Sequence, residues 1–151
     1  MDMTLNVENA EDAGIRPDLV KSAVNEVFSG EAVTISSISV LFISDDEIMK
    51  VNKKYLNHDF TTDVITFPLG EEPDSIEGEI YISIDTTRRN SAEYGVTHKS
   101  ELLRVAIHGA LHLAGYDDST SILKSKMKAK ENYYLNLIGE FTAMEDHREA
   151  Q

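Results

Sequence analysis

Two histidines and two aspartates lie close together in the last third of the chain. His108 and His112 are four residues apart, and Asp117 and Asp118 follow shortly afterwards. On a helix, side chains at this spacing project from one face at a separation that suits two nitrogen ligands of one metal ion. Gly115 can end the helix and turn the chain back, so that an acidic side chain completes a three-ligand site. Such a site keeps a position for water and lowers the pKa of that water to about 7.

The same residues also have a purely structural interpretation. Histidines at this spacing occur without any metal, and Asp117 or Asp118 could simply cap the helix expected after them. Gly109 stands where the zinc peptidase pattern His-Glu-x-x-His carries its catalytic glutamate. Glycine cannot act as a base, so a peptidase of that type is disfavoured while a metal site is not.

The elements that position this segment can be predicted from the periodicity of the sequence. Apolar spacing and a capping box at residues 44–47 predict helices over residues 17–30, 45–55, 86–94, 100–114 and 119–138. β-Branched and alternating segments predict strands over residues 33–43, 63–67 and 79–85. We expect Gly30 to end the first helix in a left-handed conformation. The pattern predicts an α+β fold, a single mixed β-sheet packed against several helices, with the metal site at the end of a helix in the C-terminal half.

Length and composition predict the broad class of protein. With 151 residues, 41% of them hydrophobic and 27% charged, the chain reads as one globular domain over residues 1–151, with a mobile polar tail from about residue 142. The absence of cysteine excludes disulfides, thiol catalysis and thiolate metal ligands. The sequence shows neither an export signal nor an apolar stretch long enough to span a bilayer, which predicts a cytoplasmic protein.

The net charge of −13 argues at first against a nucleic-acid partner. Residues 86–130, however, hold eight basic and four acidic residues, a local charge of +4. A basic face on an acidic body can still bind phosphate, because screening limits charge effects to about 8–10 Å. The alternative is that the lysines of the last helix simply form its solvated side. Tyr133 and Tyr134 on that helix could stack on RNA bases or pack in the core.

Residues 108–118, HGALHLAGYDD, resemble the signature H-G-x-L-H-L-x-G-Y-D-H of the YbeY family of bacterial rRNA maturation factors. Only the last position differs. Further similarity extends through TDVITFP at 62–68, GEI at 78–80, SELLRV at 100–105, and Met127 and Glu131. The resemblance implies a single-strand-specific, metal-dependent endoribonuclease acting in rRNA maturation (16S rRNA 3′ end processing) and ribosome quality control. Its implied partners are ribosomal RNA and the small ribosomal subunit, with neither DNA nor a membrane involved.

The resemblance also implies a set of metal ligands. The three signature histidines bind zinc in that family, so the matching residues here are His108, His112 and Asp118. These residues would be catalytic through the metal and its activated water. A carboxylate is an acceptable zinc ligand, but two histidines and one carboxylate also suit Fe²⁺ or Mn²⁺. Asp117 would then support the site or cap a helix rather than bind the metal.

A second departure from the family concerns phosphate binding. Family members usually carry an arginine after the tyrosine that matches Tyr55, and this chain has Leu56 there. Arg104, one turn before His108, is the best substitute as a catalytic or phosphate-binding residue, although an ion pair with Glu101 or another acid would explain it equally well.

Two other functions remain open: a non-catalytic ribosome-assembly factor with a structural metal, and an iron-dependent oxidase with a two-histidine, one-carboxylate triad. Asp63, which opens a predicted strand, is a turn residue or a candidate for orienting the site.

Overall fold

The computed structural model describes residues 4–58, 60–70 and 75–149. Along the chain the elements are β1 (Thr4–Glu8), a short 3-10 helix (Glu11–Ala13), α1 (Pro17–Gly30), β2 (Ile35–Ile43), α2 (Asp45–Leu56), β3 (Val64–Pro68), β4 (Ile76–Ser83), α3 (Ile84–Tyr94), α4 (His98–Leu113) and α5 (Ser121–Glu149). Among these described residues, no helix is long and apolar enough to cross a membrane.

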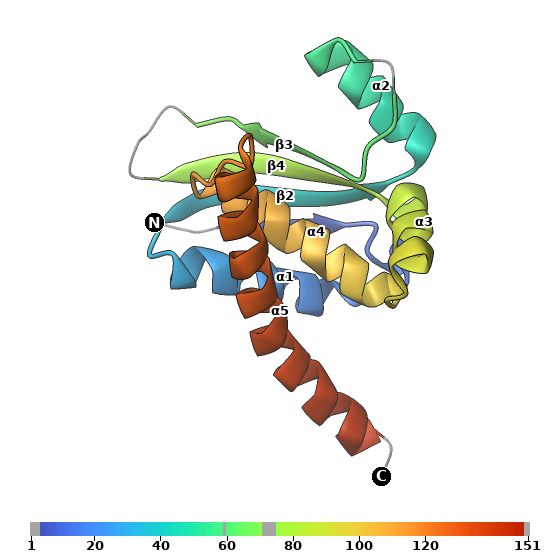
Figure 1. Ribbon diagram of the computed structural model, residues 1–151, viewed down its shortest axis with the longest axis vertical. Helices are drawn as coiled ribbons and strands as arrows, with labels where there is room; N and C mark the ends of the chain where they lie inside the picture. Colours follow the sequence, from blue (N-terminus) through green and yellow to red (C-terminus); the bar gives the residue numbers. More distant parts are fainter. Residues whose placement is uncertain (1–3, 59, 71–74, 150–151) are drawn as a thin grey trace.

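The four strands form one mixed sheet in the order β1-β2-β4-β3. β1, β2 and β4 run parallel, and β3 pairs with β4 in the antiparallel direction. Helices α1, α4 and α5 gather on one face of the sheet, while α2 lies beyond its far end (Figure 1). The predicted α+β fold with a single mixed sheet is therefore confirmed.

The core lies between the sheet and this helical layer. Ile80 and Ile82 of β4 are fully buried because alternate residues of a strand point to the same face. From the other side, α4 contributes Ala106, Ile107 and Leu111, also fully buried. α4 thus lies between sheet and solvent with one apolar face and one partly exposed face, and the partly exposed face carries both histidines.

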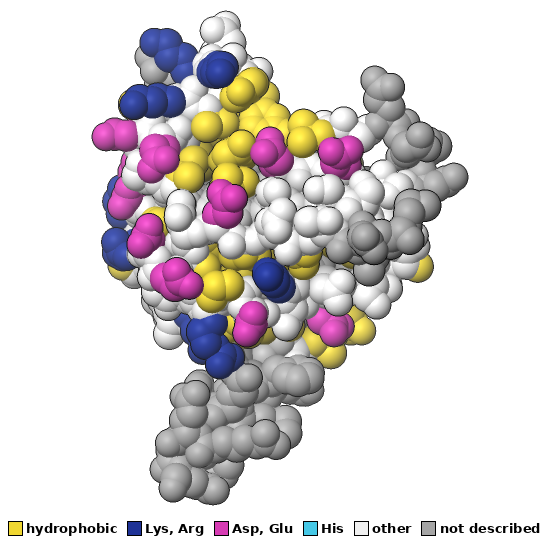
Figure 2. All heavy atoms as spheres, turned by 180° about the vertical axis from the view of Figure 1, so that it is seen from behind, with side chains coloured by type: hydrophobic (Ala, Val, Ile, Leu, Met, Phe, Trp, Pro, Cys, Tyr) yellow, Lys and Arg dark blue, Asp and Glu magenta, His cyan; other side chains and the backbone are white. Residues whose placement is uncertain are grey.

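The opposite face of the sheet is covered differently. A small second cluster packs Ile43 and Ile65 of the sheet against Ile48 of α2. Seen from this side, hydrophobic and acidic side chains share the surface, and no histidine of the described residues is visible (Figure 2). The candidate metal residues therefore belong to the helical side of the molecule.

Several element boundaries differ from the predictions. β1 was not expected; it is a five-residue edge strand in which only Leu5 and Val7 turn inward, too short a pattern to stand out. Gly30 is not the left-handed residue: it stays helical beneath the ring of Tyr134, and Ala32 takes the positive φ of 56°.

The last helix was expected to end near residue 138, yet α5 continues to Glu149. The sequence after Gly139 contains no proline and is rich in helix-forming Ala, Met and Glu residues, which explains the extension. The side chains of the tail that was predicted to be mobile, from about residue 142, lie outside the described part of the structure. The mobility of this tail stays a prediction.

Candidate metal centre

Helix α4 and the turn after it bring the two histidines and Asp118 together. Thr97 caps the start of α4, its hydroxyl accepting the backbone N–H of Ser100. At the other end, Gly115 adopts a φ of 110°, which is accessible to glycine at little cost. The chain then reverses, and the backbone N–H of Tyr116 donates to the carbonyl of Leu111. This reversal carries Asp118 back over the face of α4 from which the histidines project.

Three potential ligand atoms converge at one point. His108 Nε2 and His112 Nε2 are 3.0 Å apart, and each lies 3.6 Å from Asp118 Oδ2. An ion with tetrahedral bonds of about 2.1 Å holds its ligand atoms roughly 3.4 Å apart. The observed triangle is close to that size, so one ion can lie at equal distances from all three atoms. The donor set therefore fits a zinc-sized cation with one coordination position left for water.

Asp117 stabilises the turn and does not face this triangle. Its carboxylate accepts the backbone N–H groups of Asp118 and Ser119 and the Ser119 hydroxyl, at 2.7, 3.2 and 2.6 Å. The Ser119 hydroxyl and the backbone donors hold the pKa of Asp117 below its usual value. Asp117 therefore has a structural role in the turn, but it does not cap α5 as the sequence had suggested, because the backbone N–H of Leu123 donates to the Thr120 hydroxyl instead.

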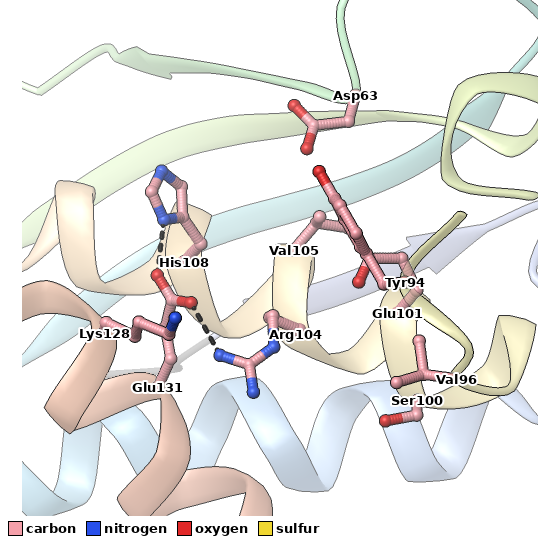
Figure 3. A pocket seen from close by; sticks show the side chains of 10 residues that line it. All are labelled: Asp63, Tyr94, Val96, Ser100, Glu101, Arg104, Val105, His108, Lys128 and Glu131. Carbon is pink, nitrogen blue, oxygen red and sulfur yellow. Dashed lines mark hydrogen bonds and ion pairs between the residues drawn. The ribbon is translucent and has the colours of Figure 1, made fainter. Parts of the chain in front are cut away.

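Glu131 of α5 binds the other ring nitrogen of His108. Its Oε2 lies 2.7 Å from His108 Nδ1, and its Oε1 accepts a hydrogen bond of 3.0 Å from Arg104 (Figure 3). Because an ionised carboxylate only accepts hydrogen bonds, Nδ1 must carry the ring proton. That leaves the lone pair of Nε2 directed at the triangle, the arrangement that a metal ligand needs.

The hydrogen bond between Glu131 and His108 shifts the pKa values of both residues. Burial on its own raises the pKa of Glu131, but the hydrogen bonds from His108 and Arg104 outweigh it and lower the pKa. Burial on its own lowers the pKa of His108, yet its hydrogen bond to Glu131 and the negative charges around it raise the pKa. The sequence pointed to Glu131 only as a further match to the YbeY family and gave it no role, because a single glutamate in a lysine-rich helix carries no distinctive spacing.

Arg104 has partners in the structure. Besides Glu131, its guanidinium donates to the side-chain oxygen of Asn132 at 2.8 Å, so the acid that it pairs with is Glu131 and not Glu101. Its side chain keeps 33% of its surface exposed. Two other basic residues of the +4 segment are also paired, Arg89 with Asp45 and Lys130 with Glu31.

A cleft of about 640 Å³ opens beside His108 on the helical side. Figure 3 shows the side chains that line it, which come from the residue before β3, the end of α3 and the segment after it, α4 and α5. Its lining includes two basic side chains, Arg104 and Lys128, and three acidic ones, Asp63, Glu101 and Glu131. Glu101 is only 4% exposed, and burial together with the charge of Asp63 raises its pKa. Leu56, at the exposed end of α2, does not line this cleft.

Gly109 is explained by the packing of α4 on the sheet. A Cβ atom at this position would lie 2.8 Å from Ile80 Cγ2 and 3.2 Å from Thr66 Cγ2. The residue after His108 therefore faces the sheet and not the cleft, so no glutamate could act there as the base of a peptidase.

Comparison with known proteins identifies the family. The family described as Endoribonuclease YbeY matches residues 6–139 of the chain. This protein belongs to the YbeY family. Its similar relatives include the protein named endoribonuclease YbeY in Chlorobaculum parvum, 40% identical over 136 residues, which are 90% of this chain and 96% of the relative. The YbeY protein of Chlorobium limicola is 38% identical over 138 residues, 91% of this chain and 95% of the relative.

The fold is shared with a solved structure. The solution structure of TM1509 from Thermotoga maritima superimposes with a TM-score of 0.66 at 32% identity, covering 95% of this chain and 93% of that protein. Membership of the YbeY family thus agrees with the sheet, the helical layer and the signature segment at the end of α4. Within the family signature, Asp118 keeps the geometric place of the third potential ligand.

Proposed function

We propose that this protein is a metal-dependent endoribonuclease that cleaves single-stranded RNA during rRNA maturation. The observation that carries the proposal is the triangle of His108 Nε2, His112 Nε2 and Asp118 Oδ2 beside a cleft whose lining includes Arg104 and Lys128. The same lining also holds three acidic side chains. Its relatives bear the name endoribonuclease, and the triangle is the part of the fold that can supply hydrolytic chemistry.

When bound, the metal ion would make hydroxide available near neutral pH and offset negative charge on a phosphodiester oxygen. The protein's own residues prepare the site. Glu131 holds the proton of His108 at Nδ1, which keeps Nε2 free as a ligand. Lys128 brings positive charge to the cleft, as does Arg104, whose side chain is 33% exposed although its guanidinium also binds Glu131 and Asn132. We expect these two residues to hold the RNA backbone. Since these contacts are with phosphates, binding should weaken as salt rises.

Zinc is the first candidate for the metal, with Fe²⁺ or Mn²⁺ as alternatives because Asp118 offers oxygen where the family signature has histidine. The substrate we propose is ribosomal RNA, within or beside the small ribosomal subunit in the cytoplasm, in processing of the 16S rRNA 3′ end and in ribosome quality control. The resemblance of the signature segments supports this part of the proposal.

One observation favours a second function. Leu56 occupies the position of the usual family arginine and cannot bind phosphate, which fits a ribosome-assembly factor whose metal is only structural. In the structure, Arg104 and Lys128 supply positive charge next to the triangle without any contribution from α2. The nuclease therefore remains the first proposal. An iron-dependent oxidase would require bound Fe²⁺ and oxygen consumption.

The test measures metal content and RNA cleavage on the same preparations. The native chain, His112→Ala, Asp118→Ala and the control Asp46→Ala, an exposed aspartate of α2, are purified without added metal. We expect about one metal ion per native and control chain, its loss in the two site variants, and cleavage of single-stranded but not duplex RNA that stops with a chelator. RNA binding by a metal-loaded native chain that cleaves nothing would instead establish the assembly factor.

A further inference from the structure

A carboxylate outside the cleft links three distant parts of the chain. Glu31, directly after α1, has a side chain only 11% exposed. Its Oε1 accepts a hydrogen bond of 2.5 Å from the Tyr116 hydroxyl. Its Oε2 accepts the Tyr134 hydroxyl and, at 3.2 Å, the ammonium group of Lys130. Tyr134 and Lys130 belong to α5, so Glu31 connects the end of α1 both to α5 and to the turn after α4.

Tyr116 is the member of this group that bears on the metal centre. It lies between Gly115, which reverses the chain, and Asp118, the third potential ligand. Gly115 and Asp117 are exposed, whereas the Tyr116 ring packs partly buried against the main core. Asp118 is thus held on a short turn whose side-chain attachment to α1 is the bond from Tyr116 to Glu31.

We propose that Glu31 is a positioning residue for the metal centre, fixing Tyr116 and, through it, the backbone that carries Asp118. The inference rests on the proposed metal site and adds to it a residue that comes from α1. His108 and His112 are already fixed on α4, but a carboxylate on a turn loses freedom when it binds an ion. A turn ordered beforehand by Glu31 reduces that entropic cost, so metal affinity should depend on a bond outside the cleft.

The two tyrosines provide a matched pair of variants. Tyr116→Phe and Tyr134→Phe each remove one hydroxyl from the same carboxylate and keep the ring. Only the first releases the turn, since Tyr134 is a buried residue of α5. Zinc affinity is measured by competition with a chromogenic chelator, and the melting temperature is measured on the metal-free proteins. Neither measurement depends on RNA cleavage.

We expect both variants to melt at lower temperature, but only Tyr116→Phe to bind zinc about 10-fold more weakly, the lower end of the loss seen when groups that orient metal ligands are removed. Equal affinity losses in both variants, or an unchanged affinity in Tyr116→Phe, would overturn the inference. As a second test, Glu31→Ala and the double variant Glu31→Ala/Tyr116→Phe should lose as much zinc affinity as Tyr116→Phe, because all three remove the bond between the Tyr116 hydroxyl and the Glu31 carboxylate. An additive loss in the double variant would contradict the inference.

The outcome is distinguishable from a failure of the proposed function. A native chain that binds zinc and shows the difference between the tyrosine variants, but cleaves no RNA, supports the positioning role and removes the nuclease. A native chain that binds no zinc, iron or manganese removes the metal site, and the positioning role with it.

Discussion

Glu131 offers the most direct test of how the centre is organised. Both of its carboxylate oxygens are used, Oε2 by the Nδ1 proton of His108 and Oε1 by Arg104. Glutamine has the same shape but only one oxygen. Because arginine can only donate hydrogen bonds, the amide oxygen of Glu131→Gln should face Arg104 and the NH₂ group should face His108. A donor at Nδ1 favours the ring tautomer with its proton on Nε2, the atom that would bind the metal.

The expected loss of zinc affinity follows from this change of the His108 tautomer. Partners that hold the second nitrogen of a ligand histidine typically contribute 10- to 100-fold in metal affinity, about 1.4 to 2.7 kcal/mol. The Glu131 side chain is only 10% exposed, so water cannot easily take over its role. We therefore expect Glu131→Gln to fall in the upper half of that range.

The assay is chelator competition for zinc on folded protein, with Glu101→Gln as the control. Glu101 is also a buried glutamate that lines the cleft. In the described part of the chain, however, no hydrogen bond joins Glu101 to His108 or His112. We expect its substitution to change affinity less than about 3-fold, below the range for groups that orient ligands. Equal losses in both glutamine variants would refute the reasoning.

A double variant tests the proposed orientation of the amide. When Arg104→Ala is added to Glu131→Gln, the amide can rotate and present its oxygen to His108. The double variant should therefore bind zinc more tightly than Glu131→Gln alone. If it binds more weakly, the tautomer argument is wrong and Arg104 stabilises the site in some other way.

Three further predictions concern stability and pH. Asp45→Asn should lower the free energy of unfolding by about 2 kcal/mol, measured by urea denaturation, because the charged carboxylate accepts hydrogen bonds of 2.6 Å from the Ser83 and Thr86 hydroxyls and so joins α2 to the start of α3. Burial on its own raises the pKa of Glu31, but the hydrogen bonds that its carboxylate accepts lower this pKa below the usual value. The charge of Glu31 therefore stabilises the fold above the ordinary glutamate pKa, and this stabilisation is lost as the pH falls through the lowered pKa. The difference in unfolding free energy between the metal-free native chain and Glu31→Gln should therefore shrink on acidification, and a constant difference would contradict this. Gly109→Ala should lower the melting temperature despite the better helix propensity of alanine, because its Cβ meets Ile80 at 2.8 Å.

Much of the fold could be predicted because its elements carry strong local signals. The apolar stripe of α1, the capping box at Ser44 and the alternation around Ile80 and Ile82 each follow from residues close together in sequence. The order of the strands could not be predicted, since parallel pairing of β1 with β2 and of β2 with β4 depends on packing between distant segments. β1 itself was missed because its inward positions are only Leu5 and Val7.

The candidate site shows the same division. The types and spacing of the residues were enough to group His108 and His112 with an acidic residue of the turn, and the resemblance to the YbeY signature pointed to Asp118 as that residue. Glu131 lies 23 residues from His108, and only the crossing of α5 over α4 brings them into contact. Glu31 is still farther away, 85 residues from Tyr116. Residues that orient a site from other elements leave no spacing pattern: Glu131 stood out in sequence only as a match to the family, and its contact with His108 is visible only in three dimensions.

The three potential ligands belong to two different kinds of element, a helix and a turn. His108 and His112 are fixed on α4, which packs so closely against the sheet that Gly109 leaves no room for a side chain. Asp118 belongs to a turn that Asp117 and Tyr116 hold in place from outside the helix. A family can therefore exchange the donor at this third position without rebuilding the other two, and the exchange alters the hardness of the site. In the proposed metal site, the residue on the turn would set the preference between metal ions, and the helix would set where any of them can bind.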